Sequence, residues 1–328
     1  MALTEELSVR AGEGTLAGTL TLPADPPPDG RVRYPMVLLL PSWLPRDRDG
    51  AWDRVAHAAW FAPSSGDEGG GLLARLADAL AERGVASLRC DPRGCGASDG
   101  SWAATPLFTR IDDARDMLSA MRSRGSLDLR RTGIVGHGEG ATLALSVAIG
   151  DPAVSALTLI GPSARPWRDV VRRGVAARER QGTDRRHPIV RALDRWSEEI
   201  LEAAERRESS IELYVPGSGV VTLELAGIEQ AIHTPPRALA TMLHRSVALV
   251  HGADDAWADP DESVLLDAAL ADAGNSPRRW LVEGSGHELA EASNDLIGEL
   301  AGDLAARIVP VELPPVLVAI EEMGDGVR

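Results

Sequence analysis

The chain has 328 residues, of which 44% are hydrophobic and 25% are charged, so it can bury a large core as one domain with an insertion or as two domains. Its net charge of −15 argues against a nucleic-acid partner, because phosphate binding needs clustered positive charge. All 34 basic residues are arginine, which we attribute to a GC-rich genome and not to a selected arginine function.

Targeting and membrane signals are missing from the sequence. The N-terminus has no basic region followed by an apolar core, which is the pattern of a secretory signal. No apolar run approaches the roughly 20 residues that a membrane span needs, so we expect no membrane partner. The only cysteines, Cys90 and Cys95, lie too close together to form a disulfide framework. These features predict a cytoplasmic protein.

The first third of the chain predicts a hairpin followed by a buried parallel sheet. Residues 6–23 alternate in the manner of two strands joined by a turn. The apolar run Tyr34–Leu40 favours a strand that is covered on both faces. The segment 41–71 is long and rich in tryptophan and glycine, which is typical of a functional or disordered loop. Helical spacing over 72–83 and a short strand over 85–90 follow.

Strands and helices continue to alternate along the rest of the chain, with one interruption. This order predicts a mostly parallel α/β sheet with helices on both faces. Further strands are expected at 132–135, 153–160, 246–251 and 279–282, and further helices at 111–122, 261–273 and 292–308.

Residues 164–240 break the alternation with two charged helical stretches (167–180 and 187–207) and a β-like patch. We interpret this segment as a helical lid inserted between strands of the sheet. The predicted organisation is a core made of residues 1–163 and 241–309, a lid at 164–240, and a C-terminal tail at 310–328.

The most informative stretch is the glycine-bracketed turn Gly136-His137-Gly138-Glu139-Gly140, which lies between an apolar strand and a helix of small residues. This layout is that of a nucleophile elbow, G-x-S-x-G, in which a serine hydroxyl stands at a sharp strand-to-helix turn. Gly138 occupies the position of that serine.

Several ordered motifs together resemble the α/β-hydrolases, in particular the bacterial esterase and serine-aminopeptidase-like group, over residues 6–308. They are a strand ending at Pro41, the Asp91–Gly100 loop, the elbow, the run His251–Asp255, and the turn Gly284–His287. The order of nucleophile position, acid and histidine is the order of this fold. The resemblance implies an α/β-hydrolase sheet flanked by helices, an inserted lid, and a Ser-His-Asp-type site that acts on esters, amides or thioesters.

The same resemblance assigns roles to residues of this chain. His287 is the expected general base and Asp255 the expected carboxylate that orients it, with Asp254 as the alternative. The backbone N–H of Glu139 is expected to form one half of an oxyanion hole. Where many relatives carry His-Gly after the first buried strand, this chain has Pro41-Ser42, so the second backbone donor would be Trp43.

Glycine at position 138 leaves three hypotheses open. Glycine tolerates the strained conformation of an elbow, which costs other residues about 1–3 kcal/mol, but it removes the nucleophile. Loss of that nucleophile lowers turnover about a million-fold in a Ser-His-Asp site. The protein is then a hydrolase whose serine has been replaced, or a non-catalytic module that binds a small molecule or a partner. In the third hypothesis, the His287-Asp255 pair catalyses water attack, elimination or cyclisation without a covalent intermediate.

Other nucleophiles and cofactors find little support in the sequence. Cys95, Ser42, Ser98 and Ser285 lie near predicted strand ends, where a packed thiol and turn-forming hydroxyls are the simpler interpretations. No C-x-x-C pair, H-E-x-x-H motif or phosphate-binding glycine loop is present, so we expect no cofactor and no metal.

The expected partner is a small-molecule ester, amide or acid, and any homodimer would form through the tail or the lid. Five lid residues are candidates for an acyl pocket, although such residues more often pack a cap against its own domain. They are Trp167, Trp196, Ile211, Leu213 and Tyr214.

Overall fold

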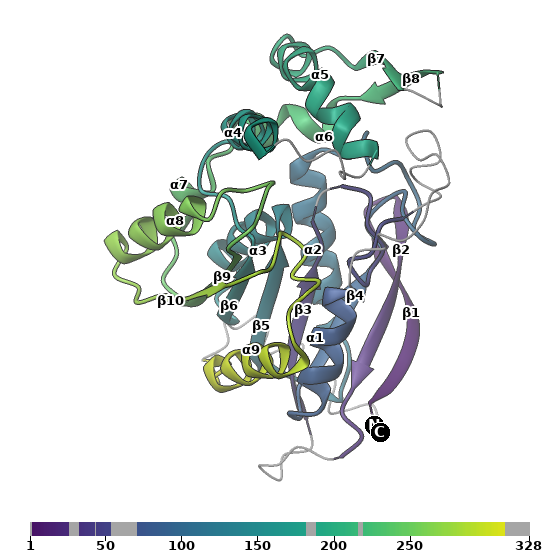
Figure 1. Ribbon diagram of the computed structural model, residues 1–328. Coiled ribbons are helices and arrows are strands. Elements are labelled where there is room, and N and C mark those ends of the chain that lie inside the picture. The colour runs from purple at the N-terminus through teal and green to yellow at the C-terminus, as the bar shows by residue number, and fades with distance from the viewer. Residues whose placement is uncertain are drawn as a thin grey trace.

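The computed structural model describes residues 2–25, 33–42, 44–53, 71–181, 188–215 and 219–311. Within them an eight-stranded sheet has the order β1-β2-β4-β3-β5-β6-β9-β10 (Figure 1). Its strands are β1 (Leu3–Ala11), β2 (Gly14–Leu22), β3 (Tyr34–Leu40), β4 (Ala86–Cys90), β5 (Leu127–His137), β6 (Val154–Ile160), β9 (Ser246–Gly252) and β10 (Arg278–Val282).

Most of the sheet is parallel, as the alternation of elements predicted. The first hairpin, β1 and β2, is antiparallel and joins the sheet through an antiparallel pairing of β2 with β4. The pairs from β4 to β10 are parallel. Strand β3 lies between β4 and β5, and its side chains alternate between the apolar clusters on the two faces of the sheet, so both faces are covered.

Helices cover both faces of the sheet, each over its own apolar cluster (Figure 1). On one face lie α2 (Leu107–Arg122), α3 (Glu139–Gly150) and α8 (Asp261–Asp272). On the other lie α1 (Leu72–Ala81) and α9 (Asn294–Arg307), which also contact each other. This arrangement confirms the predicted α/β class with helices on both faces.

The segment between the paired strands β6 and β9 carries the remaining elements, most of which Figure 1 shows beyond one end of the sheet. It contains α4 (Trp167–Gln181), α5 (Pro188–Glu205), the hairpin β7 (Ser210–Val215) and β8 (Gly219–Glu224), α6 (Ala226–Glu229), a 3₁₀ turn (Ala231–His233) and α7 (Pro236–Ala240). Most of these elements share a third apolar cluster with core residues such as Leu44 and Trp102, whereas α7 packs against α3 and α8. The predicted lid at 164–240 falls on this segment, and its role as a lid remains a prediction.

Two elements are longer than their sequence patterns predicted. Helix α2 begins at Leu107, directly after Pro106, whose extended backbone cannot continue a helix backward. Strand β5 begins at Leu127 and includes charged residues that interrupt its apolar pattern; two of them pair, since Arg131 Nε donates to Asp128 Oδ2 over 2.6 Å.

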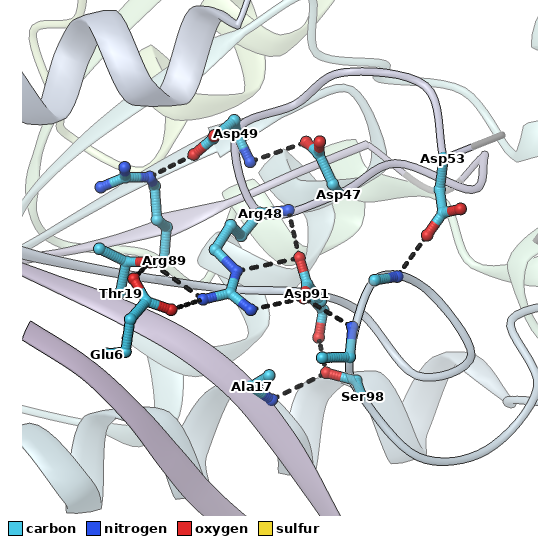
Figure 2. A network of polar contacts seen from close by, with 12 residues as sticks. Glu6, Ala17, Thr19, Asp47, Arg48, Asp49, Asp53, Arg89, Asp91 and Ser98 are labelled. Carbon is cyan, nitrogen blue, oxygen red and sulfur yellow. Dashed lines mark hydrogen bonds and ion pairs between the residues drawn. The ribbon is translucent and has the colours of Figure 1, made fainter. Parts of the chain in front are cut away.

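A network of charged groups ties the segment that follows β3 to the start of the sheet (Figure 2). Arg48 donates from Nε and Nη2 to the two oxygens of Asp91 at 3.1 and 2.7 Å, and from Nη1 to Glu6 at 2.6 Å and Thr19 at 3.0 Å. Asp91 is 3% exposed and also accepts backbone N–H groups from Arg48 and Ala97. A buried carboxylate needs such partners, so this network fixes residues 44–53 against the loop after β4.

Among the helices that the structure describes, none combines the length and the apolar character needed to cross a bilayer. Of the predicted tail at 310–328, residues 312–328 lie outside the described residues.

Candidate active site

Gly138 forms the turn between β5 and α3 and has an unusual backbone conformation. Its φ is 55° and its ψ is −118°, a combination that residues with a Cβ adopt only under strain. Its N–H donates to the carbonyl of Ile160 over 2.8 Å, which anchors the turn to the end of β6. The backbone therefore makes a sharp strand-to-helix turn at the position where the sequence pattern lacks a serine.

His287 and Asp255 come together at the same edge of the sheet, from the loops that follow β10 and β9. His287 Nδ1 lies 2.7 Å from Asp255 Oδ2, and both side chains are buried. Asp255 Oδ1 accepts the backbone N–H groups of Trp257 and Ala258 at 2.8 and 2.9 Å. The pair has the geometry of a carboxylate that orients an imidazole and stabilises its protonated form.

A second histidine supports Asp255 from the other side. His251 Nε2 lies 3.1 Å from Asp255 Oδ2 and 2.9 Å from the carbonyl oxygen of Ala258, which identifies Nε2 as the protonated nitrogen. His251 Nδ1 lies beside the hydroxyl of Ser263, which donates to it. Both ring nitrogens of His251 are thus engaged. His287 uses only Nδ1 to contact Asp255, so its Nε2 is available to another group.

Burial and charge act in opposite directions on this pair. Burial alone would raise the pKa of Asp255, but the charge of His287 and hydrogen bonds from His251 and His287 outweigh it and hold that pKa well below its usual range. Burial would lower the pKa of His287, and the neighbouring Asp255 charge raises it above its ordinary value. His287 is therefore a stronger base than a free histidine.

A buried ion pair lies behind the His287 ring. Arg46 is 1% exposed, makes a salt bridge to Glu288, and stacks over Trp52 with its guanidinium 3.7 Å from the ring centroid. His137 Nε2 lies 3.0 Å from the carbonyl oxygen of His287 and donates to it. Burial lowers the pKa of His137 to about 4, so its ring is neutral at pH 7 and acts as a fixed hydrogen-bond donor.

The space that a serine side chain would fill at position 138 is shared by two other groups. A Cβ built on Gly138 would lie 3.0 Å from His287 Nε2, so the free nitrogen of the dyad faces the vacant position. The same Cβ would overlap the hydroxyl of Ser42 and lie 2.9 Å from Ser42 Cβ. The hydroxyl of Ser42 thus stands where a side chain at position 138 would begin.

The register of the sheet explains this placement of Ser42. Leu40 of β3 pairs with Gly136 of β5 in a parallel ladder. Ser42 and Gly138 each follow their paired residue by two positions, so both side-chain positions project at the same edge and lie next to each other.

Only one of the two expected oxyanion donors, Glu139, lies within the described residues. Glu139 is the first residue of α3, so its N–H has no partner within the helix. Its buried carboxylate makes a salt bridge of 2.9 Å to Arg110, which also donates to the carbonyl of Gly227 at 3.1 Å and so links the core to the inserted segment. Trp43, the expected second donor, lies outside the described residues.

A pocket of about 1100 Å³, its open mouth included, lies over Gly138 and His287. Its walls come from the core and from the inserted segment, and they are mainly apolar. The inserted segment contributes Trp167, Val170 and Val171 from α4 and Ile200 and Leu201 from α5. Of the five predicted acyl-pocket residues, Trp167 lines this pocket, whereas Leu213 packs in the third apolar cluster and Tyr214 is exposed.

The remaining sequence candidates lie elsewhere or are engaged. Asp255, and not Asp254, contacts His287. Cys95 is a buried free thiol whose pKa burial raises far above its ordinary value. Ser98 donates to the carbonyl of Asp91 over 2.7 Å, as a turn-forming hydroxyl does, and Ser285 is buried.

The supporting roles of His251, Arg46 and Glu288 were not predicted from the sequence. The available signals were the place of His251 in the run His251–Asp255 and of Glu288 beside His287.

Within the described part of the chain, one set of side chains has the composition of a metal site: His137, His287 and Glu288, whose ligand atoms lie within 4.8 Å of one another. Each already has a partner, since His137 donates to a carbonyl, His287 binds Asp255 and Glu288 binds Arg46. In this structure all three side chains are therefore already held by other protein groups.

Comparison with known proteins identifies the family. The family model described as "Serine aminopeptidase, S33" matches residues 66–292, and no curated protein sequence matches the chain.

The fold is similar to those of several solved α/β-hydrolase structures. One is Est1E from Butyrivibrio proteoclasticus with ferulic acid bound, with 15% identity, a TM-score of 0.61, and coverage of 92% of this chain and 98% of that chain. Another is the α/β hydrolase GrgF from Penicillium sp. sh18, with 16% identity, a TM-score of 0.60, and coverage of 94% and 99%. A third is DcsB in complex with its substrate analogue, with 15% identity, a TM-score of 0.62, and coverage of 94% and 100%. Since the family model spans more than half of the sequence, the chain belongs to the serine aminopeptidase family of α/β-hydrolases.

Proposed function

We propose that this protein hydrolyses a carboxylic ester or amide, with His287 as general base and Asp255 as the carboxylate that orients it. The observation that carries this proposal is the geometry of the dyad: Nδ1 is bound to Asp255 at 2.7 Å, and Nε2 faces the vacant Cβ position of Gly138 at 3.0 Å. An imidazole held in this way can take a proton from a hydroxyl or a water that enters that space.

The electrostatics of the pocket support base catalysis. Asp255 remains ionised because its pKa is lowered, so it stabilises the positive charge that His287 gains when it accepts a proton. The backbone N–H of Glu139 points from the start of α3, where the helix dipole favours a developing negative charge on the substrate oxygen.

The apolar walls from α4 and α5 favour a substrate with an apolar acyl group. We propose that residues 164–240 act as the lid that shapes this pocket, because both helices line it while the sheet edge supplies the dyad. In the similar structure of Est1E, the bound molecule is ferulic acid, which is a carboxylic acid.

The test is hydrolysis of a panel of p-nitrophenyl esters and anilides of increasing acyl length. The wild-type chain and Asp255→Asn, which keeps the shape of the side chain and removes its charge, should be compared at equal folded concentration. We expect turnover by the wild type that falls about 10⁴-fold in Asp255→Asn, because the imidazole loses its orientation and its counter-charge. Binding of these compounds without turnover would contradict the proposal and favour a non-catalytic binding protein.

A further inference from the structure

The proposed base needs a group to deprotonate, and Gly138 has no hydroxyl. Among the residues considered as substitutes, Cys95 and Ser98 are engaged or buried in structural roles. Ser42 differs from both because it lines the pocket together with Gly138 and His287.

We infer that Ser42 is the nucleophile of this enzyme, having taken the position that a serine at 138 would occupy. The side chains of Ser42 and His287 converge on one point, since a Cβ on Gly138 would overlap the Ser42 hydroxyl and lie 3.0 Å from His287 Nε2. This inference rests on the proposed function, because it assigns the nucleophile to the dyad described above.

The sheet register makes the exchange of one serine for another geometrically simple. The ladder Leu40↔Gly136 places residues 42 and 138 side by side at the carboxyl edge of two adjacent parallel strands. A hydroxyl on β3's extension can therefore reach the same space from the neighbouring strand. Glycine at 138 is then required, because a side chain there would displace Ser42.

The segment that carries Ser42 is held in place on its far side. Residues 44–53 are fixed by the Arg48–Asp91 network of Figure 2 and by the Arg46–Glu288 salt bridge beside His287. Positioning of a nucleophile by a supported segment is what catalysis requires, because small displacements of the attacking atom cost large factors in rate.

The chemical step balances with water as the second reactant. Ser42 Oγ attacks the acyl carbon and its proton passes to His287 Nε2, while the carbonyl electron pair moves to the oxygen beside the Glu139 N–H. Collapse of this intermediate breaks the bond to the leaving alcohol or amine, which takes the proton from His287. Water then attacks the acyl-Ser42 ester, His287 accepts the water proton and returns it to Ser42 Oγ, and the acid is released.

The experiment uses an alkyl fluorophosphonate, which forms a phosphorus–oxygen bond to an activated serine and releases fluoride. The full-length wild type, Ser42→Ala, His287→Ala and the control Ser123→Ala are treated with it and analysed by intact mass and peptide mapping. Ser123 is a suitable control because its hydroxyl is exposed and donates to the carbonyl of Ala120. Far-UV circular dichroism of each variant establishes that it is folded.

We expect one adduct per chain, on Ser42, in the wild type and in Ser123→Ala, and none on this residue in Ser42→Ala or His287→Ala. Absence of an adduct on Ser42 in the folded wild type would overturn the inference. Ester hydrolysis measured on the same preparations separates the two proposals. Turnover that needs His287 but survives in Ser42→Ala retains the proposed hydrolase and rejects the Ser42 nucleophile, whereas a fall of about 10³-fold or more in Ser42→Ala supports it.

A second variant provides a readout that does not depend on the probe. Ser42→Cys places a thiol beside His287, where a neighbouring imidazolium favours the thiolate. Cys90 and Cys95 are buried, and burial raises the pKa of Cys90 to about 12. We expect iodoacetamide at neutral pH to modify the thiol of Ser42→Cys before it modifies Cys90 or Cys95. A reaction at position 42 that is no faster than that of a free thiol would contradict the inference.

Discussion

The overlap between Ser42 and the vacant position at Gly138 predicts that substitutions at these two sites are energetically coupled. Gly138→Ala adds a Cβ at a φ of 55°, which costs about 1–3 kcal/mol of backbone strain. The same Cβ would overlap the Ser42 hydroxyl, and such overpacking costs about a further 1–3 kcal/mol. In a chain that also carries Ser42→Gly, the overlapping atoms are gone and Gly138→Ala costs only the backbone strain at position 138.

The assay is a double-mutant cycle of urea unfolding with the wild type, both single variants and the double variant. We expect Gly138→Ala to destabilise the wild type more than it destabilises Ser42→Gly, with a coupling of about 1–3 kcal/mol. Gly274→Ala is the matched control, because Gly274 also has a positive φ, of 83°, but a Cβ there meets nothing within 4 Å. Effects at 138 and 42 that add within about 0.5 kcal/mol would refute the shared-space geometry.

Three further predictions concern the dyad and its support. Because Asp255 raises the pKa of His287, and the neutral form is the base, the rate of hydrolysis should rise with pH through a midpoint above 6.5; in Asp255→Asn the midpoint of the residual rate should move down. Gly161→Ala should lower kcat, because its Cβ would lie 2.9 Å from the His287 ring. It should also lower the free energy of unfolding by about 1–3 kcal/mol, because a residue with a Cβ is strained at the φ of 54° found here. Arg48→Ala should destabilise the fold by about 3–5 kcal/mol in urea, because it leaves the carboxylate of Asp91 buried without its cation.

Each of these predictions has an outcome that would contradict it. A midpoint at or below 6.5 would mean that Asp255 does not act on the titrating base. Full activity in Gly161→Ala would show that the His287 ring is not confined on this side. For Arg48, the control is Arg115→Ala, which removes an exposed ion pair with Asp112 and should change stability by about 0.5 kcal/mol or less; equal effects of the two variants would contradict the buried network.

The sequence predicted those features that depend on local pattern. The apolar run at 34–40 matches β3, and the glycine-bracketed turn at 136–140 matches the junction of β5 and α3. A short, continuous apolar run bounded by turns is typical of a strand that is covered on both faces. The starts of α2 and β5 were not predicted, because charged residues interrupt the apolar pattern there. In β5, two of these residues, Asp128 and Arg131, pair with each other three positions apart.

Features that depend on pairing between distant segments could not be predicted. The choice between Asp254 and Asp255 follows from the path of the loop after β9, which only the structure gives. The position of Ser42 beside Gly138 follows from the register of β3 against β5, and a slip of one residue would have turned it to the other face. Arg46 and Glu288 are 242 residues apart, so no local signal joins them.

We propose that the His287-Asp255 dyad drives hydrolysis in a chain that has glycine, and not serine, at position 138 of the strand-to-helix turn. The most direct measurement is kcat/KM of the wild type and of folded His287→Ala, side by side, on the best ester of the panel. We expect measurable turnover by the wild type and a loss of about 10⁴-fold or more on removal of the imidazole. Equal rates for the two proteins would contradict it.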